Sequence, residues 1–372
     1  MKNLSYLTLL MLFSFLGCSQ KSEMEICCAY LKKQGQSPTE YVVSKFNHYD
    51  YVFLGEYHRI KHDVDFVSAL IPHLYENGVR TLAYECEASS QAVVDDVLTA
   101  KEWNEQLLYH SLSTGFGIFW GYTEYLNIFK KVWEFNQTLK PDQPKFRIVL
   151  LTADWTPCQE DAFANIEPDE FMADILEKEV ISKQEKALIF CGIHHAFTNY
   201  KQPVYDFEQD TLVRLNDNRF GNIIHKKYSE KTFTVFLHSP WVSNQGWEAQ
   251  CVKPANGMID SLMAMLGNVP IAFDVKNTVM GKLKADDTYY AFGYENFKLE
   301  DFCDGYIFFA PYKEMKFVTP EPNFYNEYII ERVKEIQKCR GSSDEEVRSI
   351  TKELALELLT ERPENHFGNL IK

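Results

Sequence analysis

Short apolar runs of strand length alternate with amphipathic stretches of helical length along this chain. The first four runs lie at 51–55, 80–84, 146–151 and 187–191, and later ones at 232–237, 269–273 and 306–309. Helical spacing of apolar residues is found at 63–77, 89–98, 122–139, 170–178, 326–338 and 343–359. Strands joined by helices are typical of a mostly parallel sheet. We therefore predict an α/β fold: a mostly parallel central sheet with helices on both faces and additional C-terminal helices.

The N-terminus has the pattern of an export signal. Lys2 precedes an apolar run at 4–16, which is shorter than the roughly 20 residues of a membrane-spanning helix. Phe15-Leu16-Gly17-Cys18 resembles a bacterial lipobox, which implies cleavage before Cys18 and lipidation of its thiol. Ordinary signal cleavage nearby is the alternative.

The domain organisation follows from that pattern. We predict a lipoprotein signal peptide at 1–17, an N-terminal tether and lead-in at 18–45, and a single α/β domain with helical additions at 46–372. Ser19 after the cysteine resembles sorting to the outer membrane. The expected location is the cell envelope, with a lipid anchor as the contact with the membrane.

Charge and cysteine content limit the partners. The net charge is −15 and the sequence has no basic stripe, so we expect no nucleic-acid partner. Nine cysteines are present, or eight without Cys18, and in an exported protein this even number permits disulfides. Cys86 and Cys191 lie in apolar runs and are expected to be buried.

Ionisable residues follow each of the first four predicted strands. Glu56 and His58 follow the first, Glu85 the second, Asp154 the third, and His194-His195 the fourth. Because ligands of open parallel sheets bind beyond the carboxyl ends of the strands, these residues predict one shared site.

Two chemistries suit such a site. Glu56, His58, Glu85 and His195 could hold a divalent metal such as Mn, Co or Zn. Alternatively, one histidine acts as a general base on water and a carboxylate orients it. A serine-triad hydrolase is disfavoured, because the chain has no Gly-x-Ser-x-Gly elbow.

Several motifs are shared with a known superfamily. Leu54-Gly55-Glu56-Tyr57-His58, the strand ending in Glu85, and Gly192-x-x-His195 resemble the core of the erythromycin-esterase, haem-uptake (ChaN) and Tiki/TraB superfamily. The resemblance covers roughly 50–200 and, more faintly, the stretch to residue 309. Features similar to the esterase branch in particular are Phe119-Trp120, Glu124, Asn136 and Asp154.

The resemblance implies roles for individual residues. His58 resembles the general base, Glu56 and Glu85 its carboxylate partners that orient it or bind metal, and His195 the second active-site histidine. Tiki-type relatives are metal-dependent proteases, esterase-branch relatives open macrolide lactones, and ChaN-type relatives bind haem. One residue separates Glu56 from His58, which is the ChaN-like spacing, whereas the esterase branch has two.

Three hypotheses result. The first is a hydrolase of an ester or amide bond in a small-molecule or peptide substrate, with water activated at the Glu/His site. The second is a haem- or metal-binding lipoprotein without catalysis, in which Tyr57 and His58 bind haem iron; a purely packed Tyr57 is the alternative for that residue. The third is a structural or adhesion module that keeps only the fold.

Overall fold

The computed structural model describes residues 22–113, 120–154, 166–246, 250–360, 362 and 367–371. Cys18 and the predicted signal peptide lie outside these residues, as does Phe119. Among the described residues, no helix combines the length and apolar character needed to cross a membrane.

Seven strands of the described chain form one sheet, in the order β3-β2-β4-β1-β7-β9-β8. All neighbours are parallel except β8 and β9, which are antiparallel. The predicted α/β class is therefore confirmed. The strands are β1 (Tyr51–Glu56), β2 (Thr81–Glu87), β3 (Arg147–Thr152), β4 (Ala187–Gly192), β7 (Thr232–Leu237), β8 (Ile271–Asp274) and β9 (Gly305–Phe308).

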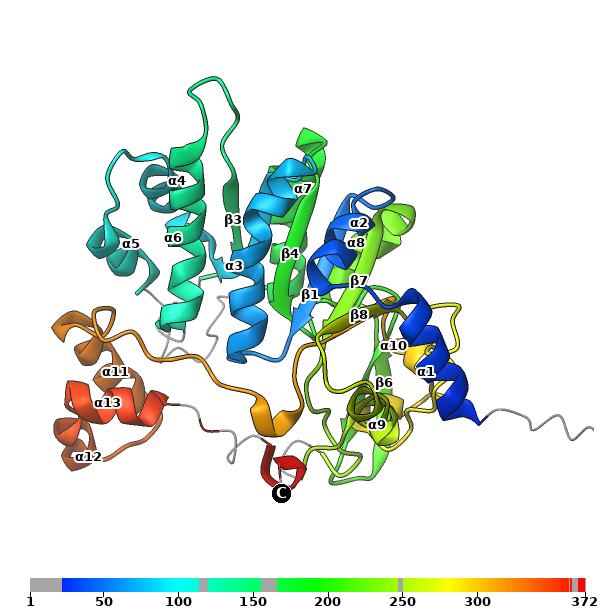
Figure 1. Cartoon of the computed structure of the whole chain (residues 1–372). Coiled ribbons are helices and arrows are strands. Elements are labelled where there is room, and N and C mark those ends of the chain that lie inside the picture. Colours follow the sequence, from blue (N-terminus) through cyan, green and yellow to red (C-terminus); the bar gives the residue numbers. More distant parts are fainter. Residues whose placement is uncertain are drawn as a thin grey trace, which may run out of the picture.

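Helices cover both faces of this sheet (Figure 1). Alternate residues of β1 show why: Val52 and Leu54 belong to one apolar cluster, and Tyr51 and Phe53 to the other. The first face packs against α2 (Pro38–Lys45), α3 (Lys61–Glu76), α4 (Gln91–Thr99), α5 (Glu105–Leu112) and α6 (Thr123–Thr138). The second packs against α1 (Glu23–Gln34), α7 (Pro168–Glu179), α8 (Phe220–Tyr228), α9 (Met258–Met265) and α10 (Leu299–Phe302).

The additional C-terminal helices are α11 (Glu327–Cys339), α12 (Asp344–Ser349) and α13 (Lys352–Leu359). The prediction of one helix over 343–359 is wrong, because the chain leaves the helix at Ile350. There the Thr351 hydroxyl accepts a hydrogen bond from the amide of Leu354 and begins α13 as a separate helix.

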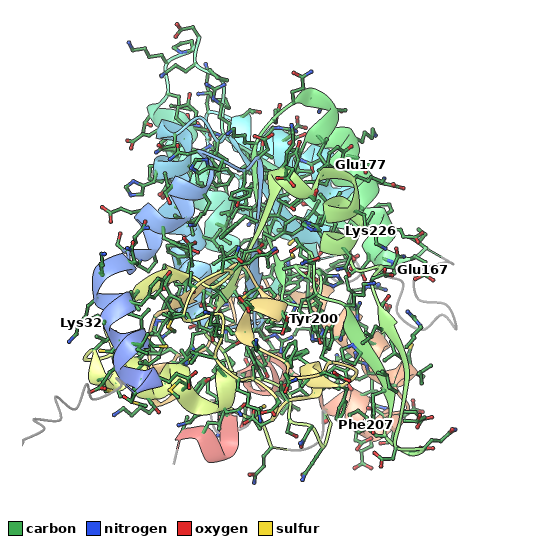
Figure 2. The ribbon with its side chains drawn as sticks, turned by 90° about the vertical axis from the view of Figure 1, so that its right-hand side faces the viewer. Lys32, Glu167, Glu177, Tyr200, Phe207 and Lys226 are labelled. Atoms are coloured by element: carbon green, nitrogen blue, oxygen red, sulfur yellow. The ribbon has the colours of Figure 1, made fainter. Side chains whose placement is uncertain are left out.

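Two regions contain secondary structure that the sequence analysis did not predict. The lead-in at 18–45 contains α1 and α2, and Cys27 and Leu31 of α1 are buried. A hairpin of β5 (Gln202–Asp206) and β6 (Thr211–Asn216) forms a second, two-stranded sheet that no apolar run predicted. Figure 2 shows Phe207 at this hairpin, where the side chain is largely exposed.

Most cysteines of the described chain are free thiols. Cys86 and Cys191 are buried in the core, as predicted, and both are free thiols. Cys27 and Cys28 are also free thiols, so neither takes part in the disulfides that the even number of cysteines permits. Cys339 is disulfide-bonded.

The carboxyl ends of β2, β4 and β1 lie side by side, because these three strands are consecutive in the sheet. In Figure 1 this edge faces the C-terminal segments, drawn in orange and red below the sheet. The predicted site residues on these strands are thereby brought together.

Candidate active site

His58 is held by a buried carboxylate. Glu56 is the last residue of β1 and its side chain is 2% exposed; its Oε1 lies 2.8 Å from His58 Nδ1. The hydroxyl of Tyr125, on α6, donates to both Glu56 oxygens at 2.9 Å. The same hydroxyl accepts a hydrogen bond from the Arg59 amide at 2.8 Å. Arg59 has a φ of 75°, so the chain turns sharply just after His58.

Glu85 reaches the site through an irregularity in β2. Tyr84 pairs with Leu150 and Glu87 with Thr152, so one extra residue is accommodated between them. Such a bulge changes the direction in which the intervening side chains point. Glu85 Oε2 then accepts a hydrogen bond of 2.6 Å from the amide of Gly192, at the end of β4.

His195 has a carboxylate partner of its own. Asp169, in the first turn of α7, places Oδ1 2.6 Å from His195 Nδ1. Asp169 also accepts hydrogen bonds from Arg219 Nη1 at 3.0 Å and from the Phe220 amide at 2.8 Å. Arg219 Nε donates to Gln202 Oε1 at 2.8 Å. The starts of α7 and α8 therefore meet at this carboxylate, and Figure 2 shows the two helices, marked by Glu177 and Lys226, side by side.

The two imidazoles face the same atom. Glu85 Oε1 lies 4.0 Å from His58 Nε2 and 3.6 Å from His195 Nε2. The side chain of His58 is 39% exposed and that of His195 23% exposed, so solvent reaches both rings. Gly192 permits this packing, because a Cβ there would lie 2.6 Å from His58 Nε2.

Charges in the site shift its ionisation. Burial lowers the pKa of His58, but Glu85 and Glu56 outweigh it and hold that pKa above its usual value. The pKa of His195 is likewise raised, because Glu85 and Asp169 outweigh burial. Burial raises the pKa of Glu56. For Asp169, burial is outweighed by His195 and Arg219, which lower the pKa.

The four residues predicted as metal ligands do not converge on one point. The Glu56 carboxylate is occupied by Tyr125 and His58 Nδ1, on the side of the imidazole away from Glu85. Within the described ranges, no group of three or more His, Cys, Asp or Glu side chains is placed to hold a metal ion. The contacts that are present allow proton transfer between imidazole and carboxylate.

Other sequence candidates lie elsewhere. Asp154 is exposed beyond the edge strand β3, so it is not the carboxylate that orients a histidine. His194, which follows the fourth predicted strand, contacts Tyr290 instead: its Nε2 lies 2.9 Å from the Tyr290 hydroxyl. A further strand-end histidine, His238 directly after β7, is buried, with Nδ1 2.9 Å from the Tyr306 hydroxyl.

Aromatic side chains contact the site at two places. The Trp120 ring meets His58 edge to face, with centroids 4.9 Å apart. Tyr57 is half-buried and packs near Phe367, at 6.3 Å between ring centroids. Two other large aromatic residues, Tyr122 and Trp241, belong to the core.

Sequence reasoning missed Asp169, Arg219 and Tyr125. The predicted site consists of residues that follow strands, whereas Asp169 and Arg219 lie at helix starts and Tyr125 inside a helix. An available signal was the carboxylate at the start of the helix after 146–151, because helix N-termini on that path point toward the carboxyl edge of the sheet.

No protein-family model matches the sequence, and no curated protein is significantly similar to it. Solved structures do match. A succinoglycan biosynthesis protein has a TM-score of 0.51 at 10% identity, over 78% of this chain and 98% of that chain. A mutant of the erythromycin esterase EreC in its open conformation has a TM-score of 0.49 at 10% identity, over 72% and 92%.

A more distant match is ChaN of Campylobacter jejuni with cofacial haem, with a TM-score of 0.30 at 14% identity, over 56% of this chain and 88% of that chain. The matches thus include members of two groups that the sequence resembles, and the similarity concerns the fold alone, as the succinoglycan biosynthesis protein with its TM-score of 0.51 illustrates. At these identities it says nothing about activity.

Proposed function

We propose that this protein hydrolyses ester or amide bonds, with water activated by His58. The observation that carries the proposal is the pair of imidazoles whose Nδ1 atoms each contact a carboxylate, at 2.8 Å for Glu56 and 2.6 Å for Asp169. Each contact favours the tautomer with the proton on Nδ1, which leaves Nε2 as the reactive nitrogen.

His58 is the better placed general base of the two. Its side chain is the more exposed of the two, and its Nε2 lies beside Gly192 and 4.0 Å from Glu85 Oε1. Glu56 orients the ring and stabilises the imidazolium that forms when water loses a proton. Tyr125 in turn fixes Glu56 with two hydrogen bonds.

The test uses residues 19–372 of the chain and a panel of small esters and amides. We expect the wild type to turn over at least one ester and His58→Ala to lose activity by about 100-fold or more. His48→Ala is the matched control, because that histidine lies between α2 and β1 at the opposite end of the strand. Full activity of a folded His58→Ala variant would contradict the proposal.

Haem binding is the second candidate. Tyr57 and His58 are adjacent, both are partly exposed, and both side-chain types ligate haem iron. Addition of haem to the purified protein would then give a Soret band that Tyr57→Phe or His58→Ala abolishes. An unchanged absorption spectrum at micromolar haem would exclude this function.

We further propose that the protein is a lipoprotein of the cell envelope, anchored through Cys18. The support is the lipobox-like sequence at 15–18. In a bacterial host, the wild type is expected in the membrane fraction with an acylated N-terminal cysteine. Cys18→Ala should remain unprocessed and carry no acyl group, and mass spectrometry of the N-terminal peptide distinguishes the two.

A further inference from the structure

Ester hydrolysis needs a second proton transfer, because the departing oxygen must be protonated. We propose that His195 is the proton donor to the leaving group, that Asp169 and Arg219 are its positioning residues, and that the substrates are esters of unactivated alcohols. This inference rests on the proposed function and adds to it a substrate class.

The surroundings of His195 fix its ring more completely than those of a surface histidine. Asp169 takes three donors: the imidazole at 2.6 Å, the Arg219 guanidinium at 3.0 Å and the Phe220 amide at 2.8 Å. The Asp169 side chain is 13% exposed. Because the carboxylate is held from three sides, His195 Nε2 stays directed at the centre of the site.

The two histidines differ in their carboxylates, and this difference assigns the roles. Asp169 pairs with the cationic Arg219 guanidinium at 3.0 Å and accepts from the Phe220 amide at 2.8 Å. Besides its histidine, Glu56 has the neutral Tyr125 hydroxyl as its hydrogen-bond donor, at 2.9 Å. The imidazolium is better stabilised beside the ionised Asp169. A second imidazolium is disfavoured, because His58 and His195 repel each other when both are charged. The resting site therefore has an acid at His195 and a base at His58.

The reaction needs one proton on the pair of His58 and His195 at the start, and that proton is on His195. Water gives a proton to His58 Nε2, and its oxygen forms the new bond to the ester carbonyl carbon. The bond from that carbon to the alcohol oxygen breaks, the electron pair goes to the oxygen, and His195 Nε2–H supplies its proton. The products are a carboxylic acid and an alcohol.

Glu85 lies between the two histidines, where a proton must pass from His58 back to His195 after each reaction. Its Oε1 is 4.0 Å from one Nε2 and 3.6 Å from the other. After release of the products, the proton on His58 returns to His195 by way of this carboxylate or solvent. The same carboxylate stabilises whichever imidazole is charged.

The proposed substrate class follows from the presence of a proton donor, His195, for the leaving group. An alkoxide is a strong base and leaves slowly unless it is protonated, whereas para-nitrophenolate leaves without a proton. A site with a fixed proton donor therefore gains most on alkyl esters. Loss of the proton donor should therefore lower the rate of hydrolysis of alkyl esters strongly and that of an activated ester hardly at all.

The experiment compares ethyl butyrate with para-nitrophenyl butyrate, which share an acyl group. We expect Asp169→Asn to lower kcat/KM for the ethyl ester by about 100-fold and that for the nitrophenyl ester by less than about 5-fold. Asp169→Glu should recover part of the loss. Asp174→Asn, an exposed carboxylate on the same helix, is the matched control.

The outcomes separate the two claims. An equal loss on both esters would overturn the assignment of His195 as the acid while leaving ester hydrolysis intact. A wild type that cleaves neither ester, nor any of the wider panel, would overturn the proposed function itself. His195→Gln gives a second test, since it removes the donor without relying on Asp169, and it should show the same dependence on the leaving group.

Discussion

The Glu85 carboxylate is the residue on which the electrostatics of the site depend. Its side chain is 12% exposed. Among the described ion pairs, its partners are the imidazoles of His58 and His195, both on Oε1. Its charge raises the pKa of both histidines. Its second oxygen is anchored by the Gly192 amide. Glu85 therefore couples the protonation of one histidine to that of the other.

A pH dependence follows from this coupling. His58 must be neutral to act as a base, and its pKa is raised above 6.5, so activity should increase with pH through an acid-side midpoint above that value. Activity on alkyl esters should fall again at higher pH, where His195 loses the proton that it gives to the leaving group. Glu85→Gln removes one of the charges that raise this pKa, so its midpoint should lie at lower pH. Asp154→Asn, an exposed strand-end carboxylate, should leave it unchanged. A midpoint that does not move in Glu85→Gln would contradict the coupling.

The same shifts affect stability with a defined sign. A histidine whose pKa is raised by folding stabilises the folded state fully below its unfolded pKa, near 6.5. That contribution is lost as the pH rises through the folded pKa. The contribution of His58 and His195 to the free energy of unfolding should therefore decline on the alkaline side of pH 6.5.

Tyr125 links the buried carboxylate to the backbone of the active-site turn. Tyr125→Phe removes the donor to both Glu56 oxygens and the acceptor for the Arg59 amide. We expect a loss of about 1–3 kcal/mol in the free energy of unfolding, measured by denaturant titration, together with a lower kcat. Tyr122→Phe, whose hydroxyl donates to Leu359 at 3.1 Å instead, should keep normal kcat.

At the scale of elements, the strand ends decide where chemistry can occur. Gly55 and Gly192 both precede a histidine by three residues, but their neighbours differ. A Cβ at Gly192 would meet His58 Nε2 at 2.6 Å, whereas one at Gly55 would meet the buried Phe236 ring at 2.8 Å. The similar spacing therefore reflects two different close contacts.

These contacts predict opposite phenotypes. Gly192→Ala displaces the His58 imidazole, which is partly exposed and not part of the apolar core, so activity should fall by about 100-fold with little change in melting temperature. Gly55→Ala strains the core and should lower the melting temperature. Thermal unfolding and kcat/KM of both variants check this, and an active, unchanged Gly192→Ala variant would contradict the geometry.

The sequence predicts helices and strands well where burial dictates the pattern of apolar residues. Residues 51–55 and 187–191 form β1 and β4 because both faces of these strands are covered, which requires continuous apolar runs. The β5–β6 hairpin escaped prediction because β6 is largely exposed. The break at Ile350 was missed because apolar spacing continues across it, and the Thr351 cap decides the conformation locally.

The site was predictable to the extent that single strands supply it. Glu56, His58, Glu85 and His195 follow strands, and the consecutive order of β2, β4 and β1 brings them together. Asp169 meets His195 because the start of α7 lies beside the loop that follows β4, which is a long-range consequence of the fold. No spacing in the sequence encodes that contact.

For the whole molecule, the C-terminal end returns to the neighbourhood of the site. Phe367 is buried in a cluster with Ile60, Tyr312, Met315 and Phe317, against which Tyr57 packs. Ile60 lies two residues after His58. The end of the described chain thus supports the turn that carries the proposed base.

Truncation of this contact should destabilise the protein. Phe367→Ala is expected to cost about 3–5 kcal/mol in the free energy of unfolding, because a fully buried aromatic ring is lost. Leu358→Ala is the control, since that side chain is 67% exposed. Equal stability of the two variants in denaturant titrations would show that the C-terminal end does not pack as described.

The central claim is that two carboxylate-held imidazoles share a single proton. It is tested most directly by ¹⁵N NMR of the imidazole nitrogens of His58 and His195 across the neutral pH range, assigned with His58→Gln and His195→Gln. We predict that Nδ1 carries the proton in both rings and that near neutral pH His195 is the imidazolium while His58 is neutral. A proton on Nε2 of neutral His58, or two imidazoles that titrate independently, would contradict the account.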